Sequence, residues 1–157
     1  MQMSLNLEQL QEAKASLKKL PMLGPALWLF ARDERKKYTF LADQDWLVMP
    51  PLILDQCKLY MKDDIPWAFC TWAFVNDAVN QRLESALPRI APHEWKSGDH
   101  LWLVDLVTPF GGAEEIIEDL RKTSFAGKAF KMLKPKPDGS FVVESHAEIL
   151  PESAGIH

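Results

Sequence analysis

The chain has 157 residues, of which 47% are hydrophobic and 25% charged, and its net charge at pH 7 is −4. This size and composition predict a single globular domain over residues 1–157, and the acidic balance argues against a protein that binds nucleic acid through phosphates. We expect a cytoplasmic protein, because no apolar run reaches the roughly 20 residues that cross a bilayer and the polar N-terminus lacks a secretory signal.

Two helices are predicted at the N-terminus. Leucines recur at near-helical spacing over residues 6–20, so the segment 1–20 is expected to form an amphipathic helix. Pro21 and Gly24 are predicted to end it, and a second helix is predicted over 25–31. Pro50 and Pro51 interrupt the apolar segment 45–54, which therefore predicts two short pieces.

The remainder of the chain predicts alternating strands and helices. The expected elements are a β-hairpin of strands 57–62 and 66–75, a helix over 76–86 capped by Asn76 or Asp77, a strand over 100–107, a helix over 113–122, a strand pair of 128–134 and 140–147, and a frayed tail over 150–157. This order indicates an α/β or α+β domain.

Asp105 is the first candidate for chemistry. On a regular strand it would share one face with Leu101, Leu103 and Val107. A carboxylate in such surroundings is costly unless it is paired or hydrogen-bonded. Burial would favour its neutral form, and Asp105 would then be a candidate base or a partner for an incoming ammonium. The alternative is a structural carboxylate that accepts from backbone amides or an arginine.

A glycine turn follows this strand. Thr108, Phe110, Gly111 and Gly112 connect the strand to the start of a helix, where free backbone amides form a natural anion site. Such turns are common, so the signal is weak without further context.

The aromatic and sulfur-containing residues leave alternatives open. The six tryptophans pack a core or line an aromatic cleft that accepts a hydrophobic ligand. Cys57 and Cys70 are expected to be two free, buried thiols. The histidines have no metal-site spacing, so no metal site is predicted.

Three stretches resemble, in order and spacing, the signature of the toxin-activating lysine acyltransferases. They are IPWAFCTWA at 65–73, EWKSGD at 94–99 and WLVDLVTPFG at 102–111. These enzymes attach fatty acyl groups to internal lysines of RTX pore-forming toxins. The resemblance implies a GNAT-like fold with a central mixed, mostly antiparallel sheet flanked by helices. It also places Asp105 where a family catalytic aspartate sits, and it implies no permanently bound cofactor.

A histidine that the family keeps near the N-terminus is missing. LGPALWLFA at 23–31 resembles the family stretch that precedes it, but RDERKKY follows at 32–38, with Arg35 or Lys36 in the approximate place of the histidine. A guanidinium cannot take a proton from an attacking amine, and an ordinary lysine is poorly poised to do so. The base is then Asp105, Glu34 or Asp33, or a recruited histidine such as His146, or the activity has been lost.

The resemblance also suggests partners. It implies acyl carrier protein, or coenzyme A, as the acyl donor, with Thr108, Phe110, Gly111 and Gly112 at the phosphopantetheine site. The excess of tryptophan on the neighbouring strand makes Trp72 a candidate contact of the acyl chain. The basic residues Arg32, Arg35 and Lys36 form a candidate docking patch for an acidic carrier protein.

The acceptor is left open by the sequence. It is expected to be an RTX protoxin or a small ribosomally made peptide that bears lysine or ornithine. A non-catalytic protein that binds the carrier or the acyl group is the rival hypothesis. A homodimer is compatible with the sequence.

Overall fold

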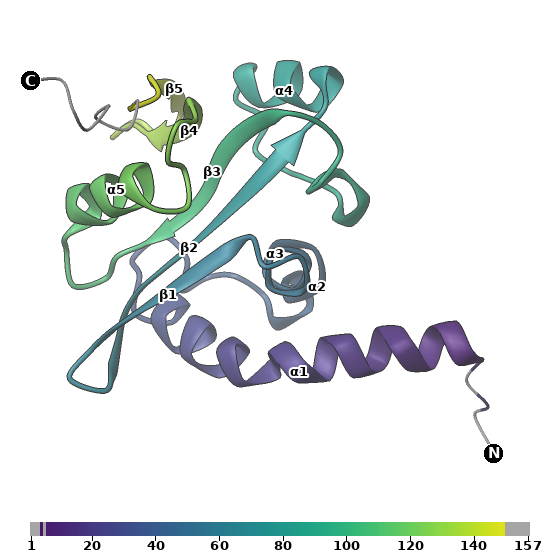
Figure 1. The fold of residues 1–157 in the computed structure, drawn as a ribbon. Helices are drawn as coiled ribbons and strands as arrows, with labels where there is room; N and C mark the ends of the chain where they lie inside the picture. The colour runs from purple at the N-terminus through teal and green to yellow at the C-terminus, as the bar shows by residue number, and fades with distance from the viewer. Residues whose placement is uncertain (1–3, 5, 150–157) are drawn as a thin grey trace, which may run out of the picture.

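A five-stranded mixed sheet organises the computed structural model, which describes residue 4 and residues 6–149. The strands follow chain order across the sheet (Figure 1) and are β1 Cys57–Lys62, β2 Ile65–Val75, β3 His100–Val107, β4 Phe130–Pro135 and β5 Phe141–His146. All neighbours are antiparallel except β3 and β4, which are parallel. The predicted mixed, mostly antiparallel sheet is confirmed, and it is consistent with a GNAT-like fold.

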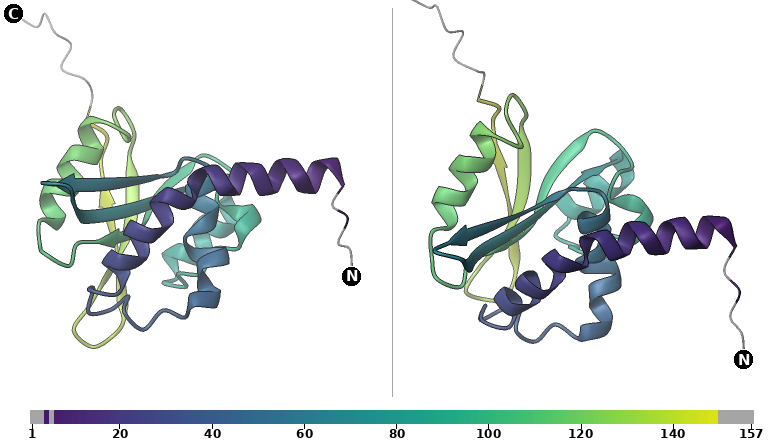
Figure 2. Two further views of the ribbon diagram at one scale, coloured as in Figure 1. Left: turned by 90° about the horizontal axis from the view of Figure 1, so that it is seen from below. Right: turned by 60° about the horizontal axis from the view of Figure 1, so that its bottom comes forward.

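Helices cover both faces of the sheet (Figures 1 and 2). They are α1 Leu7–Phe30, α2 Gln44–Leu47, α3 Met49–Ile53, α4 Asp77–Glu84 and α5 Ala113–Lys122, with short 3-10 turns η1 Leu41–Asp43 and η2 Pro92–Glu94. The apolar residues of α5 pack against one face of β2 and β3, and those of α1, α3 and α4 pack against the other. The core therefore has two layers, one on each side of the sheet.

The predicted break at Pro21 is wrong, because α1 is continuous from Leu7 to Phe30. Its start is fixed by a capping box between Asn6 and Gln9. Each internal proline removes a backbone donor and costs about 3 kcal/mol. The second half of the helix buries Leu29 and Phe30 against the sheet, and this burial offsets the cost. The predicted tail over 150–157 lies outside the described residues.

Local turn chemistry matches the predicted elements elsewhere. The segment 45–54 forms two short helices, as predicted, although Pro50 lies in the first turn of α3 rather than between the pieces. The β1–β2 hairpin closes on Asp63 and Asp64, which both adopt the left-handed conformation that a two-residue type I′ turn requires.

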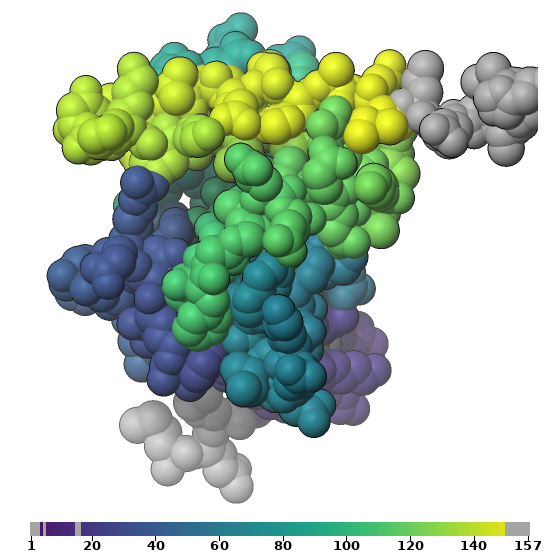
Figure 3. All heavy atoms as spheres, turned by 90° about the vertical axis from the view of Figure 1, so that its left-hand side faces the viewer, coloured from purple at the N-terminus to yellow at the C-terminus, as the bar shows by residue number. Residues whose placement is uncertain are grey.

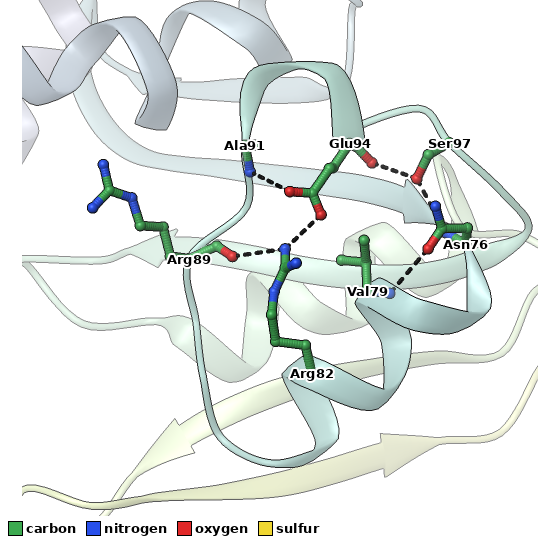
Figure 4. Close-up of polar contacts among 7 residues, drawn as sticks. All are labelled: Asn76, Val79, Arg82, Arg89, Ala91, Glu94 and Ser97. Carbon is green, nitrogen blue, oxygen red and sulfur yellow. Dashed lines mark hydrogen bonds and ion pairs between the residues drawn. The ribbon is translucent and has the colours of Figure 1, made fainter.

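The connection between α4 and β3 is anchored by polar contacts (Figure 4). Asn76 caps α4 by accepting from the backbone amide of Val79 at 2.9 Å. Arg82 donates to the carboxylate of Glu94 at 2.5 Å and to the carbonyl of Arg89 at 3.1 Å. These contacts hold the irregular segment that leads into β3 and so fix where that strand begins.

β3 contains a bulge that changes which residues share a face. Thr71 pairs with Asp105 and Trp72 pairs with Leu103, so Val104 is the extra residue. A bulge of this kind puts two residues opposite one and reverses the alternation beyond it.

The predicted common face of Leu101, Leu103, Asp105 and Val107 is therefore wrong. Leu101 and Leu103 lie on the α5 side, whereas Val107 packs with Phe69 on the α1 side. Asp105 shares that α1 side with Thr71, its partner in the ladder.

The sheet opens between its two halves. Among the described residues, β3 pairs with β4 only at Trp102 and Leu103, opposite Lys131 and Met132. Within the described chain, the half of β3 that carries Asp105 therefore has no ladder on its β4 side. None of the described helices is long and apolar enough to cross a membrane.

Candidate functional site

The centre of the site is an ion pair between Lys36 and Asp105. The Lys36 ammonium donates to Oδ1 of the carboxylate. Asp105 is 3% exposed, and the side chain of Lys36 is 31% exposed. The structure thus brings together a residue from the segment after α1 and the aspartate that the sequence singled out on β3.

The other carboxylate oxygen of Asp105 has no partner among the residues that the structure describes. Oδ2 is buried and makes no hydrogen bond within the described part of the chain. The backbone amide of Asp105 donates to the hydroxyl of Thr71 at 3.2 Å, which fixes the main chain beside the bulge. An unpaired oxygen of a buried carboxylate carries a large desolvation cost, so this oxygen is suited to accept from an incoming polar hydrogen.

A tight turn after α1 delivers Lys36 to this place. The carboxylate of Asp33 accepts from the backbone amides of Arg35 at 2.9 Å and Lys36 at 3.0 Å. The carbonyl of Asp33 accepts from the amide of Lys37 at 2.9 Å. Aspartate commonly closes such turns with its own side chain, and here it turns the chain back towards β3.

An apolar pocket of about 160 Å³ lies beside Lys36. Its lining comes from the end of α1, the segment after it and the short helices: Leu27, Phe30, Ala31, Lys36, Lys37, Thr39, Phe40, Leu41, Gln44 and Val48. Sequence patterns did not reveal this pocket, although Phe40 and Leu41 are large apolar residues in a polar segment. In the structure they are 76% and 75% exposed.

The turn after β3 packs against α1. The ring of Phe110 lies 6.1 Å from that of Trp28, centroid to centroid. The guanidinium of Arg32 stacks on the ring of Trp28 at 3.6 Å and donates to its carbonyl at 2.9 Å. Figure 3 shows the segment after α1, in dark blue, beside the green turn that follows β3.

Gly111 and Gly112 both have positive φ, at 87° and 86°. At Gly112 a Cβ atom would lie 2.4 Å from the Trp67 ring, whereas at Gly111 it would meet open space. The carbonyl of Thr108 accepts from the amide of Gly111 at 3.0 Å. The predicted strand-to-helix turn is confirmed, and it ends at the first turn of α5, which carries Glu114 and Glu115.

Trp72 lies in the core on the α5 side of the sheet, whereas Asp105 lies on the α1 side. It is 7% exposed, and its ring meets Phe125 edge-on at 5.3 Å. Cys70, its neighbour on the same face, is a free, buried thiol whose pKa burial raises far above the usual range. Cys57 is free but only partly buried, and desolvation raises its pKa to about 11.

Glu34 and His146 are not in contact with Asp105. The side chain of Glu34 is 87% exposed, and it accepts from Lys37 at 2.9 Å. His146 stacks on Phe130 at 4.6 Å, on the α5 side of the sheet, and pairs with Glu144 at 2.8 Å. Their roles in catalysis stay predictions.

The predicted docking patch is largely engaged within the chain. Arg32 lies on Trp28 and Lys36 on Asp105. Arg35 is exposed, and its side chain forms no hydrogen bond or ion pair within the described part of the chain. Of the three, Arg35 is the one that remains available to an acidic partner.

Comparisons with known proteins point in one direction. The sequence matches the model of the RTX toxin acyltransferase family over residues 15–146. It is 34% identical over 84 residues to the lysine-acyltransferase RtxC of Vibrio cholerae, and this match covers 52% of the chain and 55% of that relative. An uncharacterized protein of Synechocystis is 31% identical over 127 residues, or 79% of this chain and 86% of the relative. The protein-lysine myristoyltransferase HlyC of Escherichia coli is 27% identical over 120 residues, or 76% of this chain and 70% of the relative.

Proposed function

Since the chain belongs to the RTX toxin acyltransferase family, we propose that it moves a fatty acyl group from an acyl carrier protein to a side-chain amine of a protein or peptide. One observation carries this proposal. Among the described residues, the buried carboxylate of Asp105 keeps one oxygen without a partner, on the half of β3 that has no ladder towards β4. The apolar pocket is next to this carboxylate, because Lys36 both lines the pocket and pairs with Asp105.

The reaction needs a proton acceptor close to the attacking amine. The acceptor ammonium donates to Oδ2 of Asp105 and passes one proton to it, and the free amine attacks the thioester carbonyl. The new C–N bond forms, the C–S bond breaks, and the thiol of the carrier leaves with a proton. Lys36 is a positioning residue in this scheme, because its ammonium holds Oδ1 and turns Oδ2 towards the acceptor.

The unpaired half of β3 supports a thioester donor. An unpaired strand edge offers amide and carbonyl groups in a row, and a phosphopantetheine arm is an extended chain with two amide groups that can pair with them. Phe110, at the turn after β3, is 51% exposed and packs on Trp28. Its ring therefore adds apolar surface at the end of the strand edge where the phosphopantetheine arm would lie.

The charge of α5 favours a carrier protein over coenzyme A. Glu114 and Glu115 lie in the first turn of this helix, where their charges oppose the pyrophosphate and 3′-phosphate of coenzyme A. Phosphopantetheine on a carrier protein has a single phosphodiester, which can stay outside this turn. The exposed guanidinium of Arg35 is available to the acidic carrier.

Two kinds of acceptor fit the site. The names of two relatives, a lysine-acyltransferase and a protein-lysine myristoyltransferase, support a lysine side chain. A protoxin lysine and a lysine or ornithine of a small ribosomally made peptide present the same primary amine. A non-catalytic binding role is favoured by one observation, namely that Lys36 already occupies Oδ1 of Asp105.

The proposal is tested by presenting donor and acceptor separately. Myristoyl-carrier protein and myristoyl-coenzyme A are each incubated with the chain and with peptides that contain lysine or ornithine. We expect acylated peptide from the carrier-protein thioester at a rate well above the uncatalysed reaction. Binding of the acyl carrier without transfer to any amine would support the binding role instead.

A further inference from the structure

We propose that Lys36 is itself an acylation site of this chain, and that in the absence of another acceptor the acyl group of the bound thioester is transferred to its Nζ. This inference rests on the proposed function, since it needs the thioester donor to bind. It concerns a different acceptor, which is a lysine of the protein's own site.

The position of Lys36 is the first observation. Its ammonium donates to the carboxylate of Asp105, which is where the proposed reaction needs the acceptor amine. Other lysines described in the structure pair away from the site, among them Lys37 with Glu34, Lys58 with Asp119 and Lys131 with Glu84. In the described part of the chain, no other amine contacts Asp105.

The pocket is the second observation. Lys36 is one of its lining residues, among apolar neighbours that include Leu27, Phe30 and Val48. An acyl chain placed in this pocket would bring its carbonyl end towards the amine. The side chain of Lys36 is 31% exposed, so part of it is open to the solvent from which a thioester would arrive.

The chemical step balances without a further reagent. The Lys36 ammonium gives one proton to Asp105, and the neutral amine attacks the thioester carbonyl. An amide forms between Nζ and the acyl carbon, the C–S bond breaks, and the thiolate leaves as the thiol after it takes up a proton. No electrons are exchanged, and the products are an acylated lysine and a free carrier thiol.

The product limits its own formation. Acylation turns the Lys36 ammonium into a neutral amide, so Oδ1 of Asp105 loses its charged partner. The chain now carries its acyl group in the pocket beside the site. A second acyl group cannot be added to the same nitrogen by this route, so we expect one acyl group per chain.

The experiment is an intact-mass measurement of the full chain after incubation with myristoyl-carrier protein or myristoyl-coenzyme A, followed by peptide mapping. We expect a single myristoyl adduct located at Lys36. Lys36→Arg keeps a positive charge but should lose the adduct, and Lys131→Arg, at a lysine that pairs with Glu84 away from the site, should keep it. Asp105→Asn should slow adduct formation by about tenfold or more, with its fold checked by thermal unfolding.

Several outcomes would overturn the inference. These are an unmodified Lys36, labelling spread equally over Lys36 and Lys37, and an equal rate of labelling in folded Asp105→Asn. A lysine peptide added to the same reactions separates the two proposals. An acylated peptide in these reactions, with Lys36 unmodified in the reactions without peptide, leaves the proposed function standing and removes self-acylation. Acylated Lys36 without acylated peptide supports self-acylation and contradicts transfer to a peptide acceptor. If neither amine is acylated, both proposals are contradicted.

Discussion

Lys36 and Asp105 form an ion pair across 69 residues of sequence. The pair joins the segment that follows α1 to the bulged strand of the sheet, so the site depends on tertiary folding and not on any one motif. It also places an ammonium where the sequence resemblance leads one to expect a histidine. The chemistry of the site therefore begins from a charged pair and a carboxylate oxygen that has no partner in the described part of the chain.

Removing the ammonium should destabilise the fold. Lys36→Met keeps the length of the side chain but leaves the buried carboxylate of Asp105 without its described partner. Loss of one member of a fully buried pair costs about 3–5 kcal/mol, and the partial exposure of Lys36 lowers our expectation to about 1–3 kcal/mol. Urea unfolding measures the difference. Lys37→Met, which breaks a pair with an exposed carboxylate, should change stability by less than about 1 kcal/mol, and an equal loss in both variants would contradict this account.

The two glycines after β3 provide a matched test of the turn. Gly111→Ala forces a residue with Cβ into a left-handed conformation, at a cost of about 1–2 kcal/mol. Gly112→Ala adds to the same strain a collision with the Trp67 ring. We expect its loss of unfolding free energy to exceed that of Gly111→Ala by about 1 kcal/mol or more. Equal losses would mean that Trp67 moves aside freely.

Trp72 and Phe40 separate core packing from acyl-chain binding. Trp72→Ala removes a core ring that packs on Phe125 and should cost about 3–5 kcal/mol of stability, with equal loss of transfer for short and long acyl donors. Phe40→Ala removes an exposed ring from the pocket lining. It should leave stability nearly unchanged and weaken transfer of long chains more than short ones. The check is transfer measured with octanoyl and myristoyl donors, and a selective loss of long chains in Trp72→Ala instead would assign the acyl chain to the core face.

Asp119 should make stability depend on pH. Hydrogen bonds from Lys58 at 2.6 Å and Tyr60 at 2.5 Å hold its pKa below the ordinary value. Because the folded pKa lies below the unfolded one, the stabilisation is present above the unfolded value of about 4 and is lost as the pH falls through the folded pKa. Asp119→Asn should therefore be less stable than the parent chain at pH 7, and this difference should shrink in acid. A difference that stays constant from neutral to acidic pH would rule out the carboxylate as its source.

Much of the fold could be predicted from local patterns. The β1–β2 hairpin, β3 and α5 follow from alternation, helical periodicity and turn residues, and they appear at or within a residue of the predicted positions. Pro21 misled the prediction, because the burial of Leu29 and Phe30 that holds the helix together is a tertiary effect. No window of sequence around a proline contains that information.

The site was harder to predict than the fold. Asp105 could be found from its apolar neighbours and from the resemblance, but its face could not, because a bulge at Val104 leaves no mark in a run of strand-forming residues. The role of Lys36 was also hidden, since a lysine in a charged segment reads as solvated surface. Its contact with Asp105 depends on the turn that Asp33 closes and on the packing of α1 against the sheet.

Acyl transfer by Asp105→Asn tests the central claim most directly. The substitution is nearly isosteric and removes the negative charge that accepts the proton. Wild-type chain, Asp105→Asn and the exposed control Asp45→Asn are each given myristoyl-carrier protein and a lysine peptide, and the acylated peptide is measured by mass spectrometry. We predict a fall of about 10²-fold or more in Asp105→Asn, with a cooperative unfolding transition that shows a folded chain, and an unchanged control. Near-normal transfer by a folded Asp105→Asn chain would contradict the account.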